Sequence, residues 1–85
     1  MTVEFGSWNG PRKVIKKNIK TIKEALDTVQ GFLDQHHITS YYWRYVGRYF
    51  KETIIDYGSP SSFFAIDVDV EDIINYGKTK TEQTV

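Results

Sequence analysis

The stretch TIKEALDTVQGFLDQHH (residues 21–37) decides the fold, because it carries the strongest periodic signal in the chain. Thr21 followed by Glu24 forms a capping box, which predicts that a helix begins near Thr21 and runs over residues 21–37. Residues 13–20 fit either extended chain or an earlier helical turn. Apolar residues recur at spacings of three and four, which places them along one side of an α-helix; they are Ile15, Ile19, Ile22, Leu26, Val29 and Leu33.

Segments rich in aromatic and β-branched residues flank this helix, and such residues are typical of strands. Residues 2–8 predict one strand. Residues 62–68 predict another, which is buried on both faces because it is a short and continuous apolar run. Residues 41–57 fit both a strand alternation and a helical stripe, and their composition favours strands. Residues 70–76 predict a short helix that is capped by Asp69 and ended by Gly77.

These elements predict an α+β fold in which one amphipathic helix packs on a small antiparallel sheet. The expected order is β-α-β-β-β with a short C-terminal helix. Residues 1–77 are expected to form a single domain, and residues 78–85 a flexible tail, because the tail is polar and lacks apolar anchors. The 85 residues include six Tyr, five Phe, two Trp and no Cys, so aromatic packing takes the place of disulfides.

Composition narrows the classes of function. No apolar run approaches the roughly 20 residues of a membrane span, and residues 1–8 lack the pattern of a signal peptide. We therefore expect a cytoplasmic protein that does not contact membranes. The formal net charge is zero, which gives no general attraction to nucleic acid.

Motifs for catalysis or metal binding are missing from the sequence. His36 and His37 are adjacent, so on a helix they point about 100° apart and do not chelate one metal; we expect them at the helix C-terminus. The acids of residues 67–72 lack the glycine and the closing glutamate of a calcium loop, and we expect them to end a strand and cap a helix. No serine lies in a recognisable nucleophile motif. The sequence predicts a protein that is not an enzyme and has no cofactor and no metal site.

A basic run follows the first predicted strand and contains no acid. Together with the aromatic residues of the 41–50 segment it suggests single-stranded nucleic-acid binding, in which rings stack on bases and cations neutralise phosphates. The structural alternative is that the aromatic residues fill the core and the lysines lie on a solvated helix face. The candidate nucleic-acid-binding residues are Arg12, Lys13, Lys16, Lys17, Lys20 and Lys23.

The aromatic segment itself suggests a different function. Tyr, Trp and Arg supply most of the binding energy at protein interfaces. The leading hypothesis is therefore a non-enzymatic protein-interaction module, and a sheet edge offers a route to a homodimer. The candidate partner-binding residues are Tyr41, Tyr42, Trp43, Arg44, Tyr45, Arg48 and Tyr49.

Two stretches, EALDTV (residues 24–29) and IIDYGSPSSFF (residues 54–64), give the chain a resemblance to small accessory proteins of phages and mobile elements of Gram-positive bacteria. The resemblance implies a protein of the host-cell cytoplasm that binds a host protein. It would inhibit or modulate a defence enzyme of the CRISPR type, or assist replication. Many such inhibitors mimic nucleic acid through a strongly negative charge. Because this chain is neutral, we expect it to cover a protein surface instead.

Overall fold

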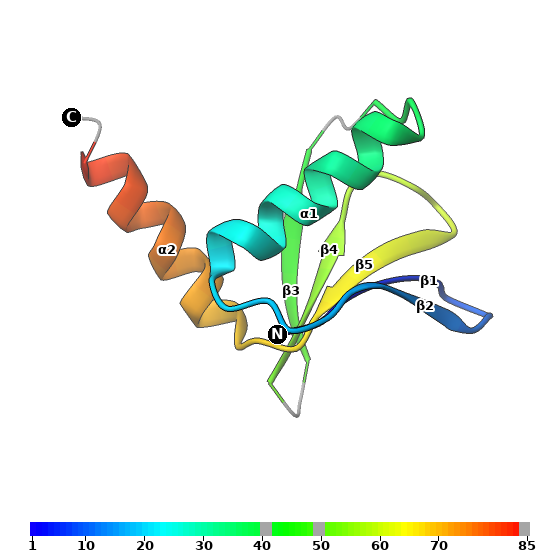
Figure 1. The fold of residues 1–85 in the computed structure, drawn as a ribbon, viewed down its shortest axis with the longest axis horizontal. Helices are drawn as coiled ribbons and strands as arrows, with labels where there is room; N and C mark the ends of the chain where they lie inside the picture. Colours follow the sequence, from blue (N-terminus) through cyan, green and yellow to red (C-terminus); the bar gives the residue numbers. More distant parts are fainter. Residues whose placement is uncertain (40–41, 49–50, 84–85) are drawn as a thin grey trace.

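The computed structural model describes residues 1–39, 42–48 and 51–83, which form a five-stranded sheet and two helices (Figure 1). The strands follow the order β2-β1-β5-β4-β3 across the sheet, and each neighbouring pair is antiparallel. The predicted α+β class, with an amphipathic helix on an antiparallel sheet, is confirmed. The elements are β1 (Val3–Ser7), β2 (Arg12–Lys16), α1 (Ile22–Gln35), β3 (Arg44–Arg48), β4 (Glu52–Asp56), β5 (Ser62–Ile66) and α2 (Val70–Gln83).

Strand β2 lies partly in the segment for which the sequence left two conformations open. It pairs with β1, and the pairing contains a register shift: Val3 lies opposite Lys16, whereas Glu4 lies opposite Val14. Ile15 is therefore an extra residue, as in a β-bulge. The irregularity allows Ile15 to pack against the core while Lys16 reaches towards α1.

Helix α1 begins where the capping box predicted. The Thr21 hydroxyl accepts a hydrogen bond from the Glu24 N–H at 3.1 Å, and the Glu24 carboxylate accepts one from the Lys20 N–H at 3.5 Å. The helix ends at Gln35, two residues before the predicted end. His37 has a φ of 55°, which is left-handed and does not continue a right-handed helix.

The apolar stripe that runs from residue 15 to residue 33 is divided between three segments. Ile15 lies on β2, and Ile19 is buried in the connection, where its N–H donates to the Met1 carbonyl at 2.9 Å. Asn18, with a φ of 58°, turns the chain before α1. Leu26 is half-buried in the middle of α1. The fully buried residues of α1 are Ala25, Val29 and Leu33.

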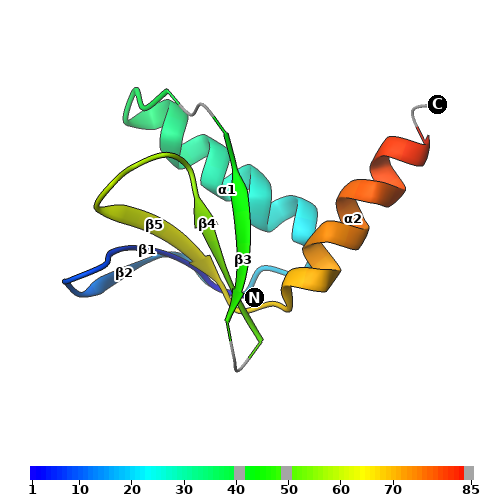
Figure 2. The same cartoon turned by 180° about the vertical axis from the view of Figure 1, so that it is seen from behind.

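Helix α1 lies across one face of the sheet, as Figures 1 and 2 show from opposite sides. Phe64 of β5 lies in the core beneath it, with ring centroids at 5.1 Å from Phe5, 5.5 Å from Phe32 and 5.2 Å from Tyr57. The neighbouring Phe63 points to the opposite face, where it is also buried. Strand β5 is therefore buried on both faces, as predicted.

Strands β3 and β4 occupy most of the described part of residues 41–57, so the strand interpretation of that segment is confirmed over the helical one. Thr53 of β4 is fully buried, and its hydroxyl donates to the Val68 carbonyl at 2.7 Å. This bond satisfies a polar group inside the sheet and joins β4 to the segment that precedes α2.

Helix α2 begins after Asp69, whose carboxylate accepts a hydrogen bond from the Glu71 N–H at 3.1 Å. The expected end at Gly77 is wrong, because Gly77 does not take the positive φ of a helix-ending glycine and the helix continues to Gln83. Residues 78–83 are therefore helical, and the domain boundary at residue 77 and a flexible tail stay predictions. Helix α2 contacts β3, and its C-terminal part projects away from the sheet (Figure 1).

Candidate functional site

The face of the sheet opposite α1 is the candidate functional site, and we call it the open face. No helix of the described residues lies across it (Figure 2). Side chains alternate between the two faces of a strand, so every second residue of each strand belongs to this face. Its residues are Glu4, Gly6, Arg12, Val14, Arg44, Val46, Arg48, Glu52, Ile54, Asp56, Phe63 and Ala65, with Trp8 at the end of β1.

The centre of the open face is apolar and buried, although no helix covers it. Aromatic and charged side chains from neighbouring strands cover it instead. The Trp8 ring lies 4.4 Å from the Phe63 ring, and the Arg12 guanidinium carbon lies 5.2 Å from the centroid of the same ring. The buried residues at this centre are Ile54, Phe63 and Ala65.

Arg12 reaches this position because Gly6 lies beside it on β1. A Cβ atom at Gly6 would approach the Arg12 Cγ to 2.8 Å, so a larger residue would push the arginine aside. The guanidinium forms ion pairs with Glu4, at 3.6 Å, and with Glu52. The hydrogen bond to Glu52 raises the pKa of Arg12 further above its ordinary value, against the opposing effect of burial. A fixed positive charge therefore bridges β2, β1 and β4.

Around this centre the open face is exposed and carries both signs of charge. Trp8 is 51% exposed, Val14 40% and Val46 39%. Arg44 and Asp56 form an ion pair at 3.2 Å near the β3 edge. The charges balance, because three arginines (Arg12, Arg44 and Arg48) meet three carboxylates (Glu4, Glu52 and Asp56). The surface offers apolar contact and paired charge, which is the composition of many protein interfaces.

The predicted partner-binding residues are divided between the two sides of the sheet. Trp43 and Tyr45 are half-buried and pack against the core beneath α1, and burial raises the pKa of the Tyr45 phenol. Arg44 and Arg48 belong to the open face, because residues alternate along β3. Tyr42 precedes β3 and is 52% exposed. Two further residues of the predicted set, Tyr41 and Tyr49, lie outside the described residues.

The predicted nucleic-acid-binding residues do not form one surface either. Arg12 belongs to the open face, whereas Lys16, at the end of β2, and Lys23, in the first turn of α1, form ion pairs with residues of α1. Lys13, Lys17 and Lys20 are exposed along β2 and the connection to α1. The run is therefore spread over a strand, a loop and a helix.

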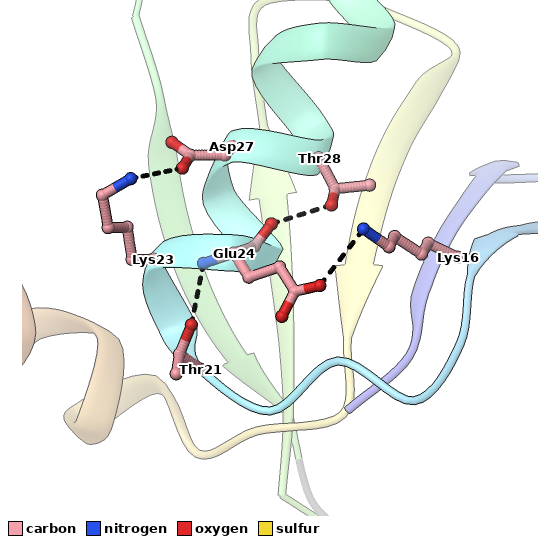
Figure 3. Close-up of a pocket in the computed structure, with 6 residues that line it drawn as sticks. All are labelled: Lys16, Thr21, Lys23, Glu24, Asp27 and Thr28. Carbon is pink, nitrogen blue, oxygen red and sulfur yellow. Dashed lines mark hydrogen bonds and ion pairs between the residues drawn. The ribbon is translucent and has the colours of Figure 1, made fainter.

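An open hollow of about 440 Å³ at the N-terminal end of α1 contains the two paired lysines (Figure 3). Lys16 lies 3.1 Å from Glu24, and Lys23 lies 2.7 Å from Asp27. Hydrogen bonds from Lys16 and from the Lys20 N–H lower the pKa of the Glu24 carboxyl, and the bond to Asp27 raises that of Lys23. Cations and carboxylates are paired within the hollow, so it has no excess charge with which to bind an anion.

The histidines and the acidic segment occupy the places that the sequence suggested. His36 follows the last residue of α1, and its ring lies 4.3 Å from that of Phe32. The Asp67 carboxylate accepts a hydrogen bond from the Thr2 N–H at 2.6 Å, and Asp69 caps α2. In the part of the chain that the structure describes, no group of three or more His, Cys, Asp or Glu side chains is placed to hold a metal ion.

Sequence reasoning did not single out Trp8, Val14 or Val46 as surface residues. The alternation along residues 2–8 and 44–48 shows which residues share a face of the sheet. It does not show which of the two faces α1 covers, and that decides which residues are exposed.

The fold and the open face together define a small α+β domain that has one helix-covered and one uncovered sheet face. The chain matches no family model, no curated protein and no solved structure. None of the helices in the described ranges has the length and apolar character needed to cross a membrane.

Proposed function

We propose that this chain is a non-enzymatic protein-interaction module that binds a partner protein through the open face of its sheet. The observation that supports the proposal is the exposure of Trp8, Val14 and Val46 around a centre whose residues are buried. Tryptophan and arginine are enriched among the residues that supply most of the binding energy at protein interfaces, and Trp8 and Arg12 both lie over Phe63. A preorganised surface also loses little conformational entropy on binding.

Two features suggest the class of partner: the balanced charge of the open face and the resemblance of the sequence to phage accessory proteins. The open face has three cations and three carboxylates, so it suits a mixed protein surface better than a polyanion. The similarity to phage accessory proteins makes a host defence enzyme of the CRISPR type, or a replication protein, the first class to test. In this proposal the protein acts in the cytoplasm, that of the host cell if a phage encodes it.

A capture experiment with matched variants tests the proposal. Wild-type protein, a Trp8→Ser/Val46→Ser variant and an Ile74→Ser variant are immobilised and incubated with lysate of a Gram-positive host. Ile74 on α2 is 42% exposed, which is close to Val46, and it lies away from the open face, so it serves as the control. Circular dichroism confirms that the variants are folded.

We expect the wild type and the Ile74→Ser variant to retain the same host protein and the open-face variant to lose it. The purified partner then gives a dissociation constant by calorimetry, and we expect the open-face variant to bind at least about tenfold more weakly, as for the loss of one hot-spot contact. Equal affinities for all three proteins would show that the open face is not the binding surface.

Single-stranded nucleic acid is the second candidate ligand, because Lys13, Lys17 and Lys20 are exposed and close in sequence. Fluorescence anisotropy with labelled oligonucleotides at low salt tests it. Binding that falls steeply as salt is added, and that a Lys13/Lys17/Lys20→Glu variant loses, would favour this candidate over protein binding.

A further inference from the structure

We infer that strand β2 accepts an extended acidic segment of a partner protein, which adds a sixth strand at this edge of the sheet. The inference goes beyond the proposed function, because it concerns the edge of the sheet and not the open face. Strand addition of this kind takes its affinity from hydrogen bonds of the main chain and its specificity from alternate side chains.

The position of β2 is the first argument. It is the last strand in the sheet, and among the described strands it pairs with β1 alone. In an antiparallel pair the N–H and C=O groups of alternate residues point away from the partner strand, so β2 presents such groups along its outer side. All of its residues except Ile15 are exposed, and the β1–β2 hairpin lies at one extreme of the molecule (Figure 1). The other edge differs, because α2 contacts β3.

The charge beside this edge is the second argument, and only cations without an internal partner count towards it. Arg12 and Lys16 are already held by carboxylates of the same chain. Three other lysines of residues 12–20 are exposed, and within the described ranges they take part in no ion pair. The segment contains no acid, so the edge has an unbalanced positive charge that suits a partner with carboxylates. The three lysines are Lys13, Lys17 and Lys20.

The two faces of β2 specify the pattern of the added strand. Lys13 lies opposite Phe5, which packs against the core, so the Lys13 side chain belongs to the helix-covered face. Val14 belongs to the open face and is 40% exposed. A carboxylate beside Lys13 and an aliphatic side chain beside Val14 would form favourable cross-strand pairs. The expected ligand is therefore a short extended segment in which acidic and apolar residues alternate.

The same features disfavour a second copy of this chain at the edge and limit the affinity. Two β2 edges would oppose like charges, which is how lysines protect an edge strand from pairing with its own kind. An acidic strand does not meet this repulsion, so the edge discriminates between partners by charge. The register shift between Val14 and Lys16 also confines regular pairing to a short stretch. We expect a weak complex, with a dissociation constant of about 10 μM to 1 mM.

Fluorescence anisotropy with three labelled peptides tests the inference on the full chain. The first peptide has about six alternating glutamate and valine residues, the length of a short strand. The second has lysine in place of glutamate, and the third is the first with N-methyl groups on its backbone amides. We expect only the first to bind, because the second is repelled and the third cannot donate main-chain hydrogen bonds. Equal binding of the first and third peptides would overturn the inference, since charge alone would then explain the affinity.

Two variants with the same change in total charge provide a second test. Lys13→Glu alters β2, whereas Lys78→Glu alters an exposed residue of α2 at the other extreme of the molecule. We expect Lys13→Glu to weaken binding of the first peptide by about twofold to thirtyfold, as when an attractive cross-strand pair becomes a repulsive one. Lys78→Glu should bind like the wild type. Equal effects of the two changes would contradict a site on β2.

Hydrogen exchange on the wild-type protein locates the bound peptide. We expect slower exchange at those amides of residues 12–16 that point away from β1, and no change along β3. An oligonucleotide that displaces the peptide without slowing these amides, while the peptide also leaves them unprotected, would assign the lysines to nucleic acid and overturn the inference.

The outcomes separate this inference from the proposed function. A peptide that fails to bind, while host capture still depends on Trp8 and Val46, would overturn the edge site alone. Host capture that survives in the Trp8→Ser/Val46→Ser variant, while the peptide still protects β2, would overturn the proposed function alone.

Discussion

The adjacent phenylalanines of β5 provide a matched test of which face of the sheet stabilises the fold. Phe64 is fully buried beneath α1 among three other aromatic rings, and Phe63 is 3% exposed on the open face, where Trp8 and Arg12 cover it. Both residues have the same side chain, the same strand and nearly the same burial. Replacing each in turn by alanine therefore changes little except the face from which the ring is removed.

The two substitutions should differ in cost. Phe64→Ala leaves a cavity between a sheet and a helix that cannot close over it, and we expect a loss of about 3–5 kcal/mol. Phe63→Ala leaves a space that the long side chain of Arg12 can enter and water can reach, so we expect a loss at or below the lower end of that range, about 3 kcal/mol or less. At about 0.05–0.15 kcal/mol per residue, an 85-residue domain has a stability of about 4–13 kcal/mol. The first loss is therefore a large part of the total.

Urea denaturation followed by far-UV circular dichroism measures both costs. Tryptophan fluorescence is unsuitable as the main probe, because Trp8 contacts Phe63 directly. If Phe64→Ala does not fold, Phe64→Leu and Phe63→Leu should show the same order with smaller losses. A cost for Phe63→Ala that equals or exceeds that for Phe64→Ala would refute the conclusion that the helix-covered face is the main core.

Three other substitutions probe the local contacts. Thr21→Ala removes the cap of α1 and should cost about 0.5–2 kcal/mol in urea denaturation, whereas Thr21→Ser should cost much less. Gly47→Ala places a Cβ atom 2.6 Å from the Val70 Cγ1 and should cost about 1–3 kcal/mol; the same change in a Val70→Ala background should cost less, and equal costs would contradict the contact. The hydrogen-bonded ion pair with Lys16 keeps the pKa of the Glu24 carboxyl below its ordinary 4.5. The stability that this pair adds to the fold is therefore complete above pH 4.5 and is lost as the pH falls through the lowered pKa. Denaturation midpoints measured across this range should fall less in Glu24→Gln than in the wild type.

Local signals in the sequence predicted much of the fold. The Thr21 cap marks the start of α1 because capping depends on residues only three positions apart. The apolar run of β5 predicted burial on both faces for the same kind of local reason. Strand β2 was not predicted, since its apolar content is only Val14 and Ile15 and its conformation depends on pairing with β1.

The candidate site was harder to predict because its contacts are distant in sequence. Arg12 pairs with Glu52, forty positions away, and the basic run around Arg12 suggested a phosphate ligand instead of a carboxylate from the same chain. Trp43 and Tyr45 were expected on a binding surface, yet both pack against the core beneath α1, Tyr45 from β3 and Trp43 from the residue before it. Which side of a strand a helix covers is decided by topology, and no local pattern in β3 records it.

The direction of α2 has a practical consequence for handling the protein. Fourteen helical residues with a rise of about 1.5 Å each extend about 21 Å, and they end at the opposite extreme of the molecule from the β1–β2 turn (Figures 1 and 2). A fluorophore, affinity tag or fused reporter attached beyond Gln83 would therefore lie far from Trp8 and the open face. The N-terminus lies against the body of the fold beside Ile19, and a tag placed there would crowd the sheet.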